Sequence, residues 1–245
     1  MVNAGVGYMR GLGLFLSYFA GGAMAQGFDD TFQNLNQTRW HVAEYDFTHP
    51  AFDTDWRRSQ VAAKEGLTLA LAPHEGLNRF AGGSIRTKAQ FQYGYYETRM
   101  IAAGGPGVVT GFFTYTGPHY GTRHDEIDIE ILGKDTTKLH VAWFVDGTLT
   151  NHFIPLGFDA AGCVHDYGFM WEPHTLTWFV NSKPVYQHLA KDGPIPSVPG
   201  HLFANLWAAD PSIAVWSDVA HPDTSTRARV DRVRFRPLGD VQRGS

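Results

Sequence analysis

Three carboxylates, Glu126, Asp128 and Glu130, alternate with isoleucines in the stretch 124–133, whose sequence is HDEIDIEILG. A strict two-residue period predicts a β-strand, because successive side chains leave opposite faces of a sheet. One face is therefore apolar, and the other carries three acids that repel one another. Such a row can act as nucleophile and proton donor, can bind a hard cation, or can be a solvated acidic face. The pattern alone leaves these three possibilities open.

The segments around this stretch are also short and β-prone, and turn signals such as Glu65-Gly66, Asp146-Gly147 and Pro173 separate them. Strands are expected at residues 67–71, 93–100, 108–115, 139–145, 167–171, 176–180, 203–207 and 232–235. No long amphipathic helical pattern is present in the sequence. Many short strands at regular spacing are typical of a β-sandwich or a barrel.

Length and composition favour one globular domain: the chain has 245 residues, of which 43% are hydrophobic and 18% charged. The net charge is −4 and no basic run occurs, so no nucleic-acid partner is expected. Cys163 is the only cysteine, so no internal disulfide is expected. A thiol enzyme built on Cys163 and His165 is disfavoured, because both residues fit the alternating pattern of a strand.

Residues 1–25 have the pattern of a secretory signal peptide. Arg10 precedes a short apolar run, and Ala23-Met24-Ala25 is a small-x-small cleavage site. The apolar run is short for a bilayer span, so a permanent membrane anchor is the weaker interpretation. We therefore expect a secreted protein, extracellular or periplasmic, whose mature domain covers residues 26–245 and has no membrane partner.

The acidic stretch with the GKDTTK that follows it, together with residues 112–118, 156–160 and 205–207, resembles glycoside hydrolase family 16. The resemblance is to the branch of bacterial endo-β-1,3-1,4-glucanases, or lichenases. The His124-Asp125 lead-in is also similar to bacterial succinoglycan-cleaving glycanases and plant xyloglucan enzymes of that family. The resemblance implies an all-β fold, a concanavalin A-like β-jelly-roll sandwich with a concave substrate cleft.

By this resemblance Glu126 matches the family nucleophile, Glu130 the general acid/base, and Asp128 the aspartate between them. A retaining glycosidase needs its two carboxyl groups about 5–5.5 Å apart. Residues i and i+4 of a strand are about 13 Å apart at Cα, so the long glutamate side chains must lean together. Asp128 is expected to keep Glu130 protonated while Glu126 stays charged, or to share a proton with Glu126.

Other positions of the resemblance imply a sugar-binding cleft, although each aromatic residue could instead pack in the core. The matching substrate-binding positions are Arg86, Phe113, Tyr115, Asn205, Trp207 and Trp216. Four positions depart from the lichenase pattern: Ser84 replaces Glu, Ala142 replaces Asn, Phe144 replaces Tyr, and Thr48 falls near an expected Asn. Each departure removes a hydrogen-bonding partner for sugar hydroxyl groups, so the preferred glucan is expected to change.

The resemblance also implies a structural Ca²⁺ on the convex face, held by Asp231 and by the backbone carbonyls of Gly66 and Thr31. The alternative is that Asp231 is an ordinary surface residue of a strand. No cofactor is expected for catalysis.

The sequence thus predicts a secreted retaining endo-β-glycanase that acts, as a monomer, on β-1,3-1,4-glucan or a related β-glucan. One alternative is a depolymerase of a succinoglycan-type exopolysaccharide, or a transglycosylase. Another is a non-catalytic, lectin-like glycan-binding module on the same sandwich, because a fold does not fix a function. Keeping both glutamates favours the enzyme, since binding does not require them.

Overall fold

Sixteen β-strands make up half of residues 26–243, the part of the chain that this computed structural model describes. The predicted signal peptide, residues 1–25, lies outside the described residues. Among those residues the α-helices are only α1 (Ala214–Ser217) and α2 (Leu238–Arg243), beside three short 3-10 turns. The all-β prediction is therefore confirmed.

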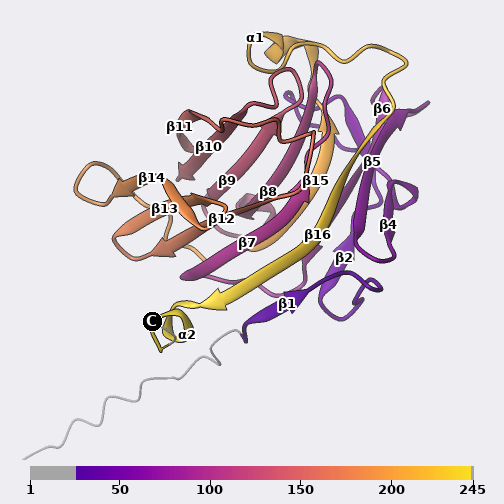
Figure 1. Ribbon diagram of the computed structural model, residues 1–245. Helices are drawn as coiled ribbons and strands as arrows, with labels where there is room; N and C mark the ends of the chain where they lie inside the picture. The colour runs from indigo at the N-terminus through magenta and orange to yellow at the C-terminus, as the bar shows by residue number, and fades with distance from the viewer. Residues whose placement is uncertain (1–25, 244–245) are drawn as a thin grey trace, which may run out of the picture.

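The strands form two curved layers that share β6, and Figure 1 shows the layers face to face. The first layer has the order β11 (Thr148–Pro155), β10 (Lys138–Val145), β9 (Asp125–Leu132), β8 (Val108–Thr116), β15 (His201–Ala208), β6 (Phe80–Thr87) and β2 (Trp40–Val42). The second runs from β6 through β5 (Leu67–Pro73), β16 (Thr226–Pro237), β7 (Gly94–Ile101), β12 (His165–Glu172) and β13 (Thr175–Val180) to β14 (Lys183–Leu189). The short strands β1 (Phe28–Asp30), β3 (Thr54–Trp56) and β4 (Val61–Ala63) pair with β16, β6 and β5.

The acidic stretch is β9, in the middle of the first layer, and its two faces differ as predicted. The isoleucines Ile127, Ile129 and Ile131 are completely buried between the layers. Burying one such side chain contributes about 1.5–3 kcal/mol. A slip by one residue would move all three isoleucines to the other face, so their burial fixes the register that aligns the acids.

A side chain of the second layer also holds the backbone of β9 in place. The indole Nε1 of Trp178, on β13, donates a hydrogen bond of 3.0 Å to the backbone oxygen of Asp128. Trp178 is fully buried. The opposite sheet is thereby attached to β9 at its central acidic residue.

The turn between β10 and β11 confirms the Asp146-Gly147 prediction. Asp146 has φ 50° and Gly147 has φ 77°, so both adopt the left-handed conformation that tight hairpins need. Gly66, in the turn between β4 and β5, has φ 119°, a conformation that disfavours other residues. These turns set which residues of neighbouring strands lie opposite one another.

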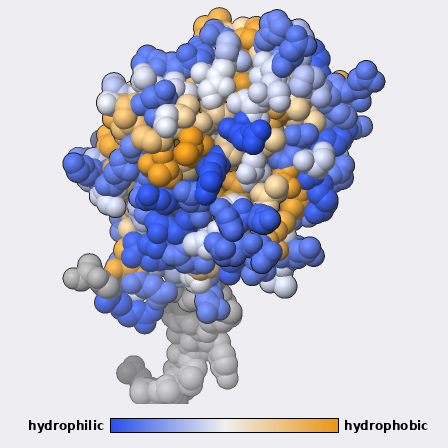
Figure 2. Space-filling view, turned by 45° about the vertical axis from the view of Figure 1, so that its right-hand side comes forward, coloured by the Kyte–Doolittle hydropathy of each residue, from blue (hydrophilic) through white to orange (hydrophobic). Residues whose placement is uncertain are grey.

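The surface shown in Figure 2 is mainly hydrophilic, with hydrophobic residues gathered in separate small patches. Within residues 26–243, no helix has the length and apolar character needed to cross a membrane.

Candidate active site

Three carboxyl groups line one face of β9, and histidines hold two of them. Asp128 is 5% exposed, and the side chains of Glu126 and Glu130 are 16% and 17% exposed. His124 Nε2 lies 2.6 Å from Glu126 Oε2. On β10, His140 Nδ1 lies 2.9 Å from Glu130 Oε2. Each glutamate thus has one oxygen fixed by an imidazole ring.

The electrostatics of the row place a proton at its centre. Burial, followed by the charges of Glu126 and Glu130, raises the pKa of Asp128 well above its usual range. Burial also raises the pKa of Glu126; the hydrogen bond and charge of His124 oppose that rise, and the charge of Glu130 adds to it. A hydrogen bond joins the carboxyl groups of Asp128 and Glu126. This arrangement supports the expectation that Asp128 shares a proton with Glu126.

The strand on one side of β9 presents predicted cleft residues to the acids. Tyr115 lies opposite Glu126 in the β8–β9 register, and Phe113 lies opposite Asp128. Burial and then the Glu126 charge raise the pKa of the Tyr115 phenol. Phe113 stacks on Phe203 of β15 with ring centroids 4.9 Å apart. Both predicted rings therefore share the face of the carboxylates.

The strand on the other side carries two of the departures from the lichenase pattern. Phe144 lies opposite Glu126, and Ala142 lies opposite Asp128. The Phe144 ring stacks on His124 at 4.5 Å, so it supports the imidazole that holds Glu126. Ala142 adds no polar atom beside Asp128.

Farther across the same face lie two more predicted residues. Asn205 of β15 lies opposite Gly111, which in turn lies opposite Glu130. A Cβ atom on Gly111 would be 2.5 Å from Asn205 Oδ1, so the glycine leaves room for the amide. That oxygen is buried and accepts no hydrogen bond from the described residues, which makes it a candidate acceptor for a ligand hydroxyl group. Arg86 of β6 lies one strand beyond and is half-buried.

Neither of the two predicted tryptophans is a fully exposed ring on which a sugar could stack. Trp207 is 5% exposed and stacks on Phe52 at 4.0 Å. Trp216, on α1, lies beside Trp207, with ring centroids 6.0 Å apart, and packs against His140, with ring centroids 5.6 Å apart and the ring planes inclined at 69°. Trp207 therefore exposes little of its surface, whereas Trp216 is half-buried beside the Glu130–His140 pair.

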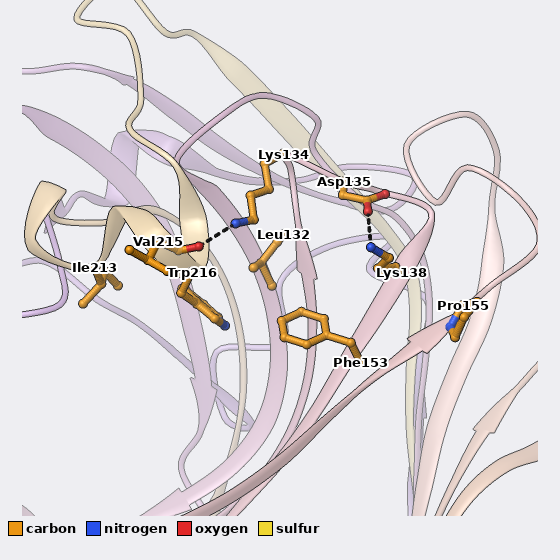
Figure 3. A pocket seen from close by; sticks show the side chains of 9 residues that line it. All are labelled: Leu132, Lys134, Asp135, Lys138, Phe153, Pro155, Ile213, Val215 and Trp216. Carbon is orange, nitrogen blue, oxygen red and sulfur yellow. Dashed lines mark hydrogen bonds and ion pairs between the residues drawn. The ribbon is translucent and has the colours of Figure 1, made fainter.

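A cavity of about 640 Å³ opens next to this pair, and Figure 3 shows Phe153 and Trp216 among the residues that line it. Phe153 of β11 is 46% exposed, and its ring packs on His140 at 4.5 Å. At the rim, Lys134 donates to the backbone oxygen of Val215 and Lys138 pairs with Asp135. The cavity combines apolar walls with a polar rim, as small-molecule and sugar sites do.

Two of the predicted cation ligands, Asp231 and Gly66, lie side by side, and an arginine also contacts Asp231. Gly66 N donates to the oxygen of Phe32, the neighbour of Thr31, and Asp231 Oδ1 lies beside Gly66. Arg229 Nε donates to Asp231 Oδ1 at 2.6 Å. An ion at this position would therefore compete with the Arg229 guanidinium group for the Asp231 carboxylate.

Residues 48–231 match the family described as glycosyl hydrolases family 16. The chain belongs to this family. Two β-glucanases are similar in sequence: one from Acetivibrio thermocellus, 38% identical over 216 residues, and one from Bacillus subtilis, 39% identical over 203 residues. The alignments cover 86% and 80% of this chain, and 63% and 82% of those proteins. The chain thus spans less than two thirds of the length of the Acetivibrio protein.

The structural comparison agrees with the family assignment. The β-glucanase of Bacillus licheniformis superposes with a TM-score of 0.80 at 34% identity. The match covers 85% of this chain and 97% of that structure. The predicted family-16 jelly roll is therefore confirmed.

Sequence reasoning missed the two histidines and Phe153. The period-two alternation of residues 138–144 places His140 on one face of its strand, but only the pairing register shows that this is the face of Glu130. His124 was visible as the residue two before Glu126, a spacing that puts both on one face of an extended chain. Phe153 gave no signal, because β11 is exposed along nearly its whole length.

Proposed function

We propose that this chain is a retaining endo-β-glucanase that hydrolyses β-1,3-1,4-glucan or a related β-glucan. The observation that carries the proposal is the row of three neighbouring carboxyl groups on β9, with Glu126 and Glu130 each held by one histidine. The similarity to bacterial β-glucanases supports the substrate class.

The reaction takes two displacement steps. First the Glu126 carboxylate attacks the anomeric carbon, the bond to the leaving sugar breaks, and Glu130 gives its proton to the departing oxygen. Then the Glu130 carboxylate takes a proton from water, the water oxygen attacks the anomeric carbon, and the bond to Glu126 breaks. Both steps use only carboxyl groups and water, so the chemistry needs no cofactor.

Asp128 serves the nucleophile. With its pKa raised, Asp128 keeps a proton that it can donate to Glu126, and a neutral Asp128 avoids a third negative charge in the row. The hydrogen bond stabilises Glu126 as the leaving carboxylate of the second step.

The decisive experiment replaces each glutamate. Glu126→Ala is expected to lower kcat by about four orders of magnitude or more, because the nucleophile is gone. Added azide should restore turnover and give the product of inverted configuration. Glu130→Ala should lose least on substrates with good leaving groups, which need little protonation. Glu75→Ala, at an exposed position, is the control.

Full β-glucan hydrolysis by both Glu126→Ala and Glu130→Ala would falsify the assignment. Binding of glucan without hydrolysis by the wild-type protein would favour the lectin-like alternative.

The departures near the acids leave room for another glycan. Ala142 and Phe144 replace polar residues opposite Asp128 and Glu126, and Ser84 lies opposite Asn205. A succinoglycan-type depolymerase or a transglycosylase is therefore the second candidate. Initial rates on barley β-glucan, laminarin, xyloglucan and succinoglycan, with products sized by chromatography, separate the candidates: larger products than the substrate identify transglycosylation.

Three further proposals concern the whole protein. Cleavage after Ala25 would export residues 26–245 as one catalytic domain, and N-terminal sequencing of the secreted protein tests this. A monomer is expected by light scattering. A structural calcium ion at Asp231, Gly66 and Thr31 stays a prediction from the family resemblance, and the ion pair of Asp231 with Arg229 weighs against it.

A further inference from the structure

His140 is the hydrogen-bonding partner of Glu130. Its Nδ1 lies 2.9 Å from Glu130 Oε2, and its side chain is only 5% exposed. The two residues lie directly opposite each other in the β9–β10 register, so the contact follows from strand pairing and does not depend on a mobile loop. In the Glu130 carboxyl group, Oε2 is therefore held by His140, and Oε1 is left for the substrate.

The other neighbours of Glu130 leave His140 without a substitute. On the β8 side the opposite residue is Gly111, which has no side chain. On β9 itself the neighbouring groups on this face are the carboxyl groups of Asp128 and Glu126, and these hydrogen-bond to each other. Among the described residues, no side chain other than His140 hydrogen-bonds to Glu130.

The surroundings of His140 decide which of its nitrogens carries the proton. Its ring packs against two others, Phe153 with centroids 4.5 Å apart and Trp216 with centroids 5.6 Å apart. Nε2 is buried and has no hydrogen-bond partner among the described residues. A buried N–H without an acceptor is rarer in proteins than an acceptor without a donor. The proton therefore belongs on Nδ1, where it is donated to Glu130 Oε2.

We propose that His140 is a positioning residue for the general acid/base, holding Glu130 Oε2 through Nδ1–H so that Oε1 alone carries and delivers the catalytic proton. This inference rests on the proposed function. In the first step the proton moves from Oε1 to the departing oxygen, and in the second Oε1 takes a proton from water. His140 keeps its own proton throughout, because Oε2 accepts the same hydrogen bond from Nδ1 in both states of the carboxyl group.

The test compares two substrates with different needs for protonation. His140→Ala should lower kcat/KM by about 100-fold on the polysaccharide, whose leaving group is a sugar, the size expected when acid catalysis is impaired. On a dinitrophenyl oligosaccharide the loss should stay below about tenfold, because that leaving group needs little protonation. His140→Asn should recover most of the polysaccharide activity, since the asparagine amide nitrogen is as many bonds from Cα as Nδ1. A role in packing alone would lower activity on both substrates equally and would not be rescued by asparagine.

Two controls complete the experiment. His152→Ala removes a histidine of β11 whose partner is Tyr186, away from the carboxyl row, and should leave both rates unchanged. If His140→Ala unfolds, as thermal denaturation shows, His140→Leu fills the space between the rings and replaces it. Equal losses on both substrates for the folded variant overturn the inference. Glu130→Ala is measured in parallel on the same two substrates. If Glu130→Ala loses equal activity on both substrates, the proposed function is wrong as well. If Glu130→Ala loses more activity on the polysaccharide but His140→Ala does not, only the positioning role of His140 is rejected.

Discussion

Two aspartates on β9 are almost equally buried, yet their surroundings have opposite effects. Asp125 is 2% exposed and Asp128 is 5% exposed. Burial by itself raises the pKa of both carboxyl groups. The pKa of Asp125 is nevertheless lowered, while the pKa of Asp128 is raised far above its usual range. The difference must come from the partners.

Donors surround Asp125. Both of its oxygens receive hydrogen bonds from the Arg123 guanidinium, at 2.9 and 3.0 Å. The backbone N–H groups of Ser197, Val198 and Asp146 donate to it as well. These bonds attach two loops to the end of β9, and together they outweigh the cost of burial.

Asp128, in contrast, has acids on either side and a neutral Ala142 opposite. An arrangement that raises the pKa of a buried carboxyl group costs stability at neutral pH and persists where it serves a site. β9 therefore begins with a structural carboxylate and continues into the proposed catalytic ones, and the hydrogen-bonding and charged partners distinguish them where burial does not.

Of changes to these two aspartates and to the partners of the acids, Asp128→Asn is expected to lower activity most. An amide can still donate to Glu126 but cannot exchange an acidic proton, so kcat/KM on β-glucan should fall by about 100-fold or more. A raised pKa means that the native state binds more protons than the unfolded state once the pH exceeds the ordinary aspartate value. Wild-type stability from this group is therefore lost as the pH rises, while the asparagine has no charge to acquire. In urea unfolding, the free energy of unfolding of the variant should therefore increase relative to that of the wild type as the pH rises. A difference between the two proteins that does not change with pH would contradict this account.

Asp125→Ala should have a smaller effect on the rate and a large one on stability. It leaves three backbone N–H groups and Arg123 without their acceptor, which is expected to cost about 2–4 kcal/mol of unfolding free energy. Here the lowered pKa gives the opposite sign: the contribution is present above the ordinary aspartate value and is lost as the pH falls.

The variant and the wild type should therefore converge in urea unfolding at acid pH. The kcat per folded molecule, measured at low temperature, should remain close to the wild-type value. A loss of kcat as large as that of Asp128→Asn would erase the distinction between the two aspartates.

The alternation in β9 was enough to predict the strand, its two faces and the acids on one of them. The family resemblance supplied the architecture around it. The partners of those acids could not be read from the sequence, because the contacts of Asp125 with Ser197 and of Glu130 with His140 depend on loop packing and strand register. The burial of Trp207 beneath Phe52 was equally unreadable, since the two residues are distant in the sequence.

His124→Ala removes the hydrogen-bonding partner of Glu126, the proposed nucleophile, and should have a moderate effect on activity. Burial raises the pKa of Glu126, and His124 counteracts it through its hydrogen bond and charge. Without the imidazole the pKa of Glu126 should rise further, and the nucleophile must be ionised to attack. The acidic limb of the kcat/KM profile is therefore expected to move to higher pH, with a loss of several-fold on the acid side and a smaller one on the plateau. The control Glu75→Ala should leave the acidic limb where it is in the wild type. If the limb does not move in His124→Ala either, the imidazole does not lower the pKa of Glu126.

The smallest effect concerns Asp231, which resembles Asp125 in having an arginine as partner. Because Arg229 Nε donates to Asp231 Oδ1 at 2.6 Å, a calcium ion would have to displace a guanidinium group. The wild-type Tm is therefore expected to change by less than about 1 °C between EDTA and millimolar CaCl₂, since a ligand stabilises only in proportion to its binding. In Arg229→Ala the carboxylate is free beside Gly66, so calcium should raise the Tm of this variant more than that of the wild type. A large calcium-dependent rise in the Tm of the wild-type protein would instead mean that calcium displaces Arg229 from Asp231. The ion pair of Asp231 would then be exchangeable, unlike the hydrogen-bonded pair of Asp125 with Arg123.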